Sequence, residues 1–315
     1  MKAKIENSTH IEGLLYEHDL KMKESGPNSK NPGTQFIGGK VSIATDDKME
    51  NIVDVHFTYV TATFGSSGKP NATFDVLKDI IDGKLSSVME AGQAGAAKLR
   101  IDSALGVNDF YTDRNGKEEL VSAKRNEGGF VHTTPTLAAD ENSRNTFKCD
   151  MIITKTKRID ADEEKKTPER LEVSGYIFDF RKAMFPVTFI ALNPNAMDYF
   201  EGLDASASNP TFTQVWGRQI STVSVRQIIT ESAFGDDEVR EVTNTRKDFV
   251  ITGAAKNPYE WDDEAFITAA EFKEAQAARE IYLADVKKRS DEYKAQKAAG
   301  GATSTPAAGK EEYHF

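Results

Sequence analysis

The sequence predicts a mainly β protein with some helix, of the α+β class, whose core is a curled antiparallel sheet. Three runs near the start alternate apolar and polar side chains with the period of two that marks a strand, at residues 10–20, 35–46 and 51–60. Three glycines lie inside the first two of these runs, Gly13, Gly38 and Gly39. Since glycine within a strand usually marks a bulge or a tight bend, we expect strong curvature and closure into a small barrel.

Residues 72–129 are expected to be an insertion between two sets of strands. Residues 72–90 place apolar side chains at helical spacing, interrupted near Gly83, which favours one or two short helices. From residue 91 onward this pattern gives way to small and charged residues, and residues 114–116 supply a hairpin turn. The second part of the insertion is therefore interpreted as irregular.

A second set of strands is predicted at residues 130–137, 145–158, 170–180, 187–192, 211–230 and 239–251. The charged residues 159–167 are expected to form a hairpin loop. Residues 193–203 are predicted as a helix, with Asn193 as its cap and Pro194 at its first position. The sequence has no internal repeat at a fixed period, and two barrel-like halves stay open as an alternative.

The C-terminal part of the chain differs in composition. Residues 267–297 are rich in Ala, Glu and Lys around a thin apolar stripe, which predicts a charged helix. Residues 298–310 have the composition of a flexible linker. The chain is thus divided into a core of residues 1–255, a helical extension of residues 256–297 and a flexible tail of residues 298–315. Docking of partner proteins is expected at the acidic and aromatic tip of the tail, at Glu311, Glu312, Tyr313 and Phe315.

The amino-acid composition bears on the cellular compartment of the protein. The single cysteine, Cys149, excludes an internal disulfide and a multi-cysteine zinc site, and its strand-like surroundings predict a buried thiol. No apolar run reaches the roughly 18 residues of a membrane span, and the N-terminus lacks the apolar core of a signal peptide. We therefore expect a soluble, cytoplasmic protein with no membrane partner.

The charge is distributed unevenly. A formal net charge of -10 argues against a surface that is basic throughout. The acidic residues cluster at 160–164, 236–241, 260–264 and 311–312. Two strand-like segments, residues 33–45 and 215–227, carry only Lys40, Arg218 and Arg226 as charged residues. A locally basic surface is compatible with this pattern.

Signatures of catalysis are absent from the sequence. It has no phosphate-binding loop, dinucleotide fingerprint, zinc-protease helix or nucleophile elbow, and its five histidines are scattered. Acidic pairs such as Asp46 with Asp47 resemble cation ligands, but carboxylates in charged turns commonly cap the backbone. We expect no enzyme, no cofactor and no metal site.

A binding surface is the more coherent prediction. Small closed barrels commonly bind single-stranded nucleic acid, with aromatic rings that stack on bases and Lys or Arg side chains that hold phosphates. Both kinds of residue occur on the predicted strands, and the proposed set is Lys40, Tyr59, Tyr176, Arg181, Trp216, Arg218 and Arg226. Trp216 lies in an unusually polar strand, and Lys40 follows two glycines that would let a nucleic-acid strand approach the backbone.

Three segments, HIEGLLYEHDL, FIGGKVSIATDD and NIVDVHFTYV, resemble the opening strands of the OB-fold single-stranded DNA-binding proteins. Four later segments are similar to replication-associated proteins of phages and prophages of Gram-positive bacteria, NPNAMDYFEGLD, PTFTQVWGRQIS, ITESAFGDDEVREV and KDFVITGAAKNPYEW. The resemblance implies an OB-like antiparallel β-barrel with a helical insertion and a C-terminal helix. It further implies coating of single-stranded DNA in the bacterial host's cytoplasm, with replication or recombination proteins as partners of the tail.

The resemblance has limits, and two alternatives stay open. The family usually ends in aspartates followed by Ile-Pro-Phe, whereas this chain ends EEYHF, and the chain is longer than usual, so the oligomeric state does not carry over. In the first alternative the chain is a phage structural or protein-interaction scaffold whose helix assembles with copies of itself. In the second it is a metal-dependent nuclease that uses Asp46, Asp179 or Asp204.

Overall fold

The computed structural model describes residues 5–27, 29–65, 67–114, 116–162, 167–230, 234, 238–260 and 268–298, but not the side chains of residues 222–230, 238–239 and 241–245. Strand is the dominant element, which confirms the mainly β prediction. The strands are β1 (Asn7–His18), β2 (Lys21–Glu24), β3 (Gln35–Ala44), β4 (Ile52–Val60), β5 (Lys98–Arg114), β6 (Lys117–Thr133), β7 (Asn145–Ile159), β8 (Arg170–Phe178), β9 (Met184–Ala191), β10 (Thr211–Thr230) and β11 (Glu238–Ala254). The α-helices are α1 (Ala72–Ile81), α2 (Val88–Gly95), α3 (Pro194–Gly202) and α4 (Ala269–Ala298).

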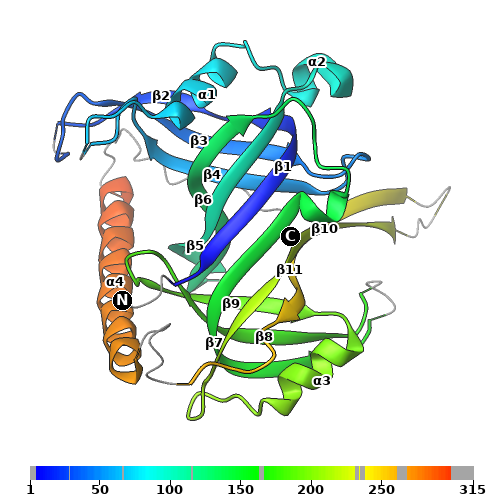
Figure 1. The fold of residues 1–315 in the computed structure, drawn as a ribbon. Coiled ribbons are helices and arrows are strands. Elements are labelled where there is room, and N and C mark those ends of the chain that lie inside the picture. Colours follow the sequence, from blue (N-terminus) through cyan, green and yellow to red (C-terminus); the bar gives the residue numbers. More distant parts are fainter. Residues whose placement is uncertain are drawn as a thin grey trace.

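The strands pair into two closed rings. In the first ring the order of pairing is β1, β3, β4, β6, β5 and back to β1, and in the second it is β7, β8, β9, β11, β10 and back to β7. Pairing within the rings is antiparallel except between β4 and β6 and between β9 and β11, which run parallel. β1 also pairs with β7, so that one eleven-stranded sheet contains both rings (Figure 1).

The two rings repeat one plan. In each, a helical segment connects the third and fourth strands of the ring, α1 and α2 in the first ring and α3 in the second. In each, the fourth and fifth strands form a long hairpin, β5 with β6 and β10 with β11. The duplication is structural, because the sequence shows no repeat at a fixed period.

The first ring closes over its own apolar core. Ile11, Val41 and Ile101 point inward from three of its strands and are fully buried. α1 covers one end of the ring with Phe74 and Leu77. Burial of each such side chain contributes about 1.5–3 kcal/mol relative to leaving it in water, so packing rather than helix propensity holds α1 in place.

The second ring has an aromatic core. The rings of Phe147, Phe189 and Phe249 meet with centroids 4.9–5.9 Å apart. α3 adds Met197 and Phe200 to this core. The helix has Pro at its first position, and Asn193 caps it by accepting a hydrogen bond from the Asn195 backbone N–H, which confirms the predicted start.

The expectation of an irregular stretch after residue 91 is wrong. Residues 98–133 are almost entirely the hairpin of β5 and β6, and the strand predicted at 130–137 is only the end of β6. The apolar alternation is weak because the far half of this hairpin projects beyond its own ring, where its side chains meet polar partners on α4 instead of a core. The short edge strand β2 was also not predicted, since it is mostly charged.

Each long hairpin reaches the other ring. Lys124 of β6 donates a hydrogen bond to the carbonyl oxygen of Thr188 on β9. In the opposite direction, Lys247 of β11 pairs with the carboxylate of Asp54 on β4. These reciprocal contacts, together with the β1–β7 pairing, bind the two rings together.

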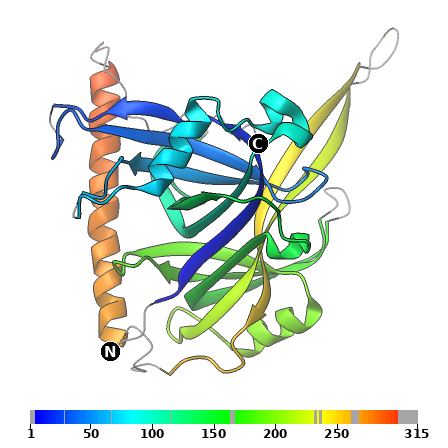
Figure 2. The same ribbon diagram turned by 45° about the horizontal axis from the view of Figure 1, so that its top comes forward.

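α4 lies along one side of both rings (Figure 2). At its start, Phe272 packs near Tyr176 of the second ring, with ring centroids 6.0 Å apart. Farther along, its Lys287 contacts Glu118 at 2.5 Å on the β5–β6 hairpin of the first ring. The predicted charged helix is therefore confirmed, and it docks rather than extends into solvent. In the part of the chain that the structure describes, no helix combines the length and apolar character that crossing a membrane requires.

Candidate functional site

Exposed aromatic side chains gather around one surface cavity of the first ring. The cavity has a volume of about 370 Å³, and Tyr59, Phe64 and Phe130 line it. These side chains are 49%, 42% and 59% exposed. Phe36 of β3 lies against Tyr59, with ring centroids 4.5 Å apart. We call these four residues the aromatic group.

Two glycines with positive φ lie near Phe36 and Phe130 in the sequence. Three residues after Phe36, β3 has a bulge at Gly39, whose φ is +145°. Phe130 follows Gly129, with φ at +109°, and a Cβ at Gly129 would lie 2.3 Å from the carbonyl oxygen of Asp102. A side chain at either position would be strained, so glycine is required there.

Most of the remaining side chains in the cavity wall are polar. Its other lining residues are Asn31, Thr34, Val60, Thr61, Thr63, Gly65, Asn71, Thr73 and Gly129. The Asn71 side chain is fixed by a hydrogen bond to the carbonyl oxygen of Thr61, at 3.0 Å. The loops at the rim of the cavity carry two exposed lysines, Lys30 and Lys69. Lys30 precedes the lining residue Asn31, and the carbonyl oxygen of Lys69 accepts a hydrogen bond from the backbone N–H of Phe64. The site thus combines aromatic faces, hydrogen-bonding groups and positive charge.

A second exposed aromatic lies on the second ring. Trp216 of β10 is 39% exposed, and its ring covers Gly253 so closely that a Cβ there would lie 2.3 Å from the indole nitrogen. Lys148 of β7 is exposed and directly opposite Trp216 in the sheet. Arg218, two residues along β10, is half-buried and donates a hydrogen bond to the side-chain oxygen of Asn142.

The remaining residues of the predicted set lie elsewhere. Lys40 is only 20% exposed, and its ammonium is 3.7 Å from Asp54, the carboxylate that also pairs with Lys247 of the second ring. Tyr176 is half-buried against α4. Arg181 is exposed over the ring of Phe180, in the turn between β8 and β9. The structure therefore does not bring the seven predicted residues together in one place.

Some predictions fall outside the described part of the chain. The backbone of Arg226 belongs to β10, opposite Val242, but its side chain is not described. The tail residues Glu311, Glu312, Tyr313 and Phe315 lie outside the described residues altogether. Sequence reasoning missed Phe64 and Phe130. The Gly-Gly-Phe run near the end of β6 is the signal that could have found Phe130.

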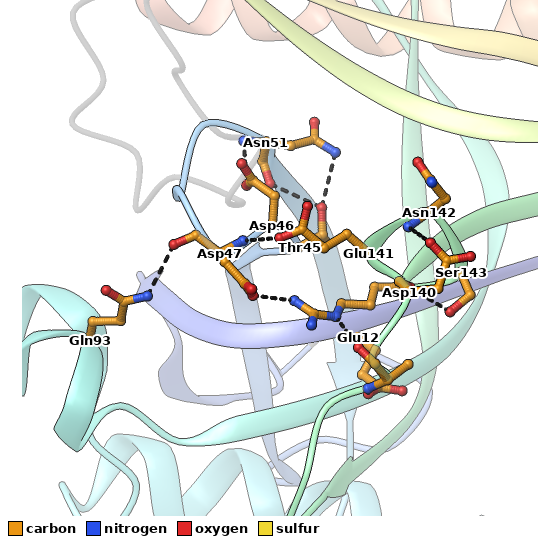
Figure 3. A network of polar contacts seen from close by, with 12 residues as sticks. Glu12, Thr45, Asp46, Asp47, Asn51, Gln93, Asp140, Glu141, Asn142 and Ser143 are labelled. Carbon is orange, nitrogen blue, oxygen red and sulfur yellow. Dashed lines mark hydrogen bonds and ion pairs between the residues drawn. The ribbon is translucent and has the colours of Figure 1, made fainter.

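Two acidic residues of the nuclease alternative, Asp46 and Asp179, accept hydrogen bonds from the backbone, and Figure 3 shows the first of them. Asp46 caps the turn between β3 and β4 by accepting from the backbone N–H of Asn51, at 2.8 Å. Its neighbour Asp47 pairs with the buried guanidinium of Arg144 at 2.7 Å, which lowers the pKa of Asp47. Asp179 likewise accepts backbone hydrogen bonds in its own turn. Among the described residues, no cluster of three potential metal ligands is present.

Asn51, which is labelled in Figure 3, also fastens the rings to each other through residues that are not labelled there. The side chain of Asn51 donates to the Gln219 carbonyl oxygen at 3.0 Å and accepts from the Ser221 backbone N–H at 2.7 Å. Gln219 in turn exchanges side-chain hydrogen bonds with Asn126 of β6. Because these groups are buried or partly buried, breaking any of them would leave polar atoms unpaired. The relative placement of the two rings is therefore well defined.

A second cavity, of about 360 Å³, lies where the β5–β6 hairpin meets the second ring. Lys124, Ser174 and Thr188 contribute to its wall. Burial lowers the pKa of Lys124 to about 8, although Asp248 and Glu172 favour its charged form. The Lys124 ammonium also lies 5.1 Å from the centre of the Phe249 ring, so it serves to hold the hairpin in place.

Comparisons with known proteins yield a family and a structural likeness. A family model described as YorF matches residues 6–289. No curated protein matches the sequence. Among solved structures, a deletion mutant of the single-stranded DNA binding protein from Thermus aquaticus is similar over 83% of this chain and 98% of that chain, with a TM-score of 0.45 and 8% sequence identity. No catalytic family is indicated by these comparisons.

Proposed function

The chain belongs to the YorF family over residues 6–289, and we propose that it binds single-stranded DNA on the aromatic group of the first ring and catalyses no reaction. The observation that carries this proposal is the exposure of Tyr59, Phe64 and Phe130 around one cavity. Large aromatic side chains gathered on a surface mark an interaction site.

The order of the strands supports the same function. We propose that each ring is an OB-like barrel, a five-stranded fold whose second and third strands, with adjacent loops, bind oligonucleotides. In the first ring those strands are β3 and β4, which supply Phe36 and Tyr59. The loop between the first two ring strands supplies Asn31 and Thr34 to the same cavity.

The chemistry of the cavity suits unpaired bases. An aromatic ring can stack on any base once the base has left the duplex, and each such stack is worth about 1–3 kcal/mol. Rim lysines such as Lys30 and Lys69 would attract the phosphates, which makes binding sensitive to salt and tolerant of sequence. Neither feature selects a duplex, whose bases are already stacked.

The proposal can be tested by measuring the affinity of the protein for labelled oligo-dT and for a duplex of the same length, by fluorescence anisotropy across a salt series. We expect salt-sensitive binding of oligo-dT and little binding of the duplex. Phe130→Ala should weaken oligo-dT binding by about 5- to 150-fold, the equivalent of one lost stack. Tyr282→Ala is the matched control, since Tyr282 is 43% exposed on α4 and does not line the cavity. Equal affinity for duplex and single strand, or an unchanged affinity in Phe130→Ala, would contradict the proposal.

Roles in phage replication and recombination, and recruitment of replication partners by the tail, remain proposals that derive from the sequence resemblance. Of the residues first chosen for phosphates, Arg218 stays in the proposal, and Lys40 leaves it because Asp54 already pairs with its ammonium. Tyr59 stays as a stacking residue, and Tyr176 leaves because α4 packs on it.

A further inference from the structure

A row of outward-facing side chains crosses five adjacent strands and joins the two rings. Its members lie directly opposite one another in successive strand pairs, Arg218 of β10, Thr146 of β7, His10 of β1, Asp102 of β5 and Phe130 of β6. Two residues away along these strands, and on the same face of the sheet, Trp216 of β10 and Ser8 of β1 both lie opposite Lys148 of β7. The row therefore leads from the aromatic group of the first ring to the exposed tryptophan of the second.

The row is long enough for a few nucleotides of an extended single strand. Neighbouring strands lie about 4.8 Å apart, so the four steps from β6 to β10 span about 19 Å. β1 crosses from one ring to the other in Figure 1, and its pairing with both β5 and β7 makes the surface continuous. No break in the sheet separates Phe130 from Trp216.

The charges along the row favour a polyanion. Arg100 and Lys148 are exposed, and Arg218 is half-exposed. Two carboxylates lie at or beside the row, Asp102, which is 3.4 Å from Arg100 and 2.8 Å from His10, and Glu12, which is 3.6 Å from His10. The three cationic side chains Arg100, Lys148 and Arg218 thus outnumber the carboxylates along the path that a bound backbone would follow.

The row is also rigid. It lies on paired strands, and the hydrogen bonds between Asn51 and β10 fix the second ring against the first. A surface that is ordered before binding loses little conformational entropy when it binds. An extended ligand can therefore use both aromatic ends without the rings having to rearrange.

We propose that a single DNA strand held at the aromatic group continues across β5, β1 and β7 and stacks on Trp216, so that one strand occupies both rings. This inference rests on the proposed function. It assigns phosphate contacts to Arg100, Lys148 and Arg218, and a second stacking position to Trp216. It differs from two independent sites, one for each ring, because it fixes the path between them.

The test uses the full chain with Trp261→Phe, which leaves Trp216 as the single tryptophan. Two oligo-dT probes are compared, one of about 2 nucleotides, too short to span both the cavity and Trp216, and one of about 15, within the range of lengths that such folds occupy. The long probe should quench Trp216 fluorescence, and the short probe should bind without quenching it. Phe130→Ala should weaken both probes.

A second measurement reports the phosphate contacts. Lys148→Ala should reduce the slope of log affinity against log salt by about 0.7 for the long probe, the value of one lost phosphate contact on a single strand. The short probe should keep its slope. Lys155→Ala is the control, because Lys155 is exposed on the same strand but beyond the row. It should leave both slopes unchanged.

The outcomes separate this inference from the proposed function. If both probes bind, but Trp216 is not quenched and Lys148→Ala behaves as Lys155→Ala does, the path is wrong and the proposed function stands. If neither probe binds, the proposed function itself is wrong. If the short probe quenches Trp216 as strongly as the long one, the two ends bind separately and the continuous path is overturned.

Discussion

Arg279 on α4 places its guanidinium 2.5 Å from the carboxylate of Asp109 on β5, and the two side chains are 9% and 0% exposed. Ser122 of β6 donates to the same carboxylate at 2.6 Å. The pair therefore fastens α4 to the long hairpin that carries Lys124 to the second ring. Because both charges are removed from water, each needs the other to offset its desolvation.

Removing one partner of this pair should destabilise the protein strongly. Arg279→Met leaves Asp109 buried without its cation, and we expect a loss of about 3–5 kcal/mol in the free energy of unfolding, measured by urea denaturation. Lys288→Met is the control, since Lys288 and Glu292 form an exposed pair at 3.9 Å on the same helix. A pair of that kind contributes about 0–1 kcal/mol. Similar effects of the two variants would contradict the assignment.

Lys124 should make stability depend on pH. Its pKa is lowered by burial from 10.5 to about 8, so between these values the unfolded chain binds more protons than the folded one. Stability therefore rises with pH through this window, and the cost of burying the charged form is fully present below pH 8. The contribution amounts to about 3 kcal/mol at most.

The measurement is the difference in unfolding free energy between the wild type and Lys124→Met from pH 7 to pH 10.5. We expect the wild type to gain stability relative to the variant as the pH rises, because methionine cannot titrate. Parallel pH profiles for the two proteins would show that Lys124 does not carry this dependence.

Local sequence patterns predicted the elements whose surroundings are simple. The first three predicted strands and α3 with its Asn193 cap pack apolar side chains against a core, whereas α4 was predicted from its charged composition and a thin apolar stripe, of which Phe272 and Val286 are buried. The β5–β6 hairpin was missed because its far half is stabilised by ion pairs with α4, such as Arg279 with Asp109, and these leave no periodic apolar signal.

The candidate site was predicted in part for a similar reason. Tyr59 and Trp216 are exposed, but an aromatic on a strand gives no sign of which face it occupies, and Tyr176 turned out to be covered by α4. Lys40 was chosen for its two preceding glycines, yet its position is set by Asp54, fourteen residues farther along the chain, and that carboxylate is shared with Lys247 of the second ring. Contacts between the rings depend on the duplication, which the sequence does not show.

Cys149 should be inert in the folded protein. It is fully buried in the core of the second ring, and burial raises the pKa of its thiol well above the ordinary value. The thiolate is the reactive form, so a thiol reagent should label the protein only as it unfolds. Labelling rates measured across a urea series should follow the unfolding transition. Rapid labelling without denaturant would contradict the burial of this side chain.

Gly217 should tolerate no side chain, because the backbone of β11 approaches β10 closely there. A Cβ at Gly217 would lie 1.9 Å from the carbonyl oxygen of Val250 and 2.9 Å from the ring of Phe147. Gly217→Ala must therefore shift β10 against β11, and we expect a loss of about 1–3 kcal/mol or more. Gly26→Ala is the control, since nothing lies within 4 Å of its Cβ position, and it should change stability by less than about 0.5 kcal/mol.

The neighbouring Trp216 supplies a second readout in the Trp261→Phe background. A shifted β10 changes the exposure of the indole, so the emission maximum of Trp216 should move in Gly217→Ala and stay unchanged in Gly26→Ala. An unaltered stability and emission in Gly217→Ala would show that the two strands have room that the structure does not give them.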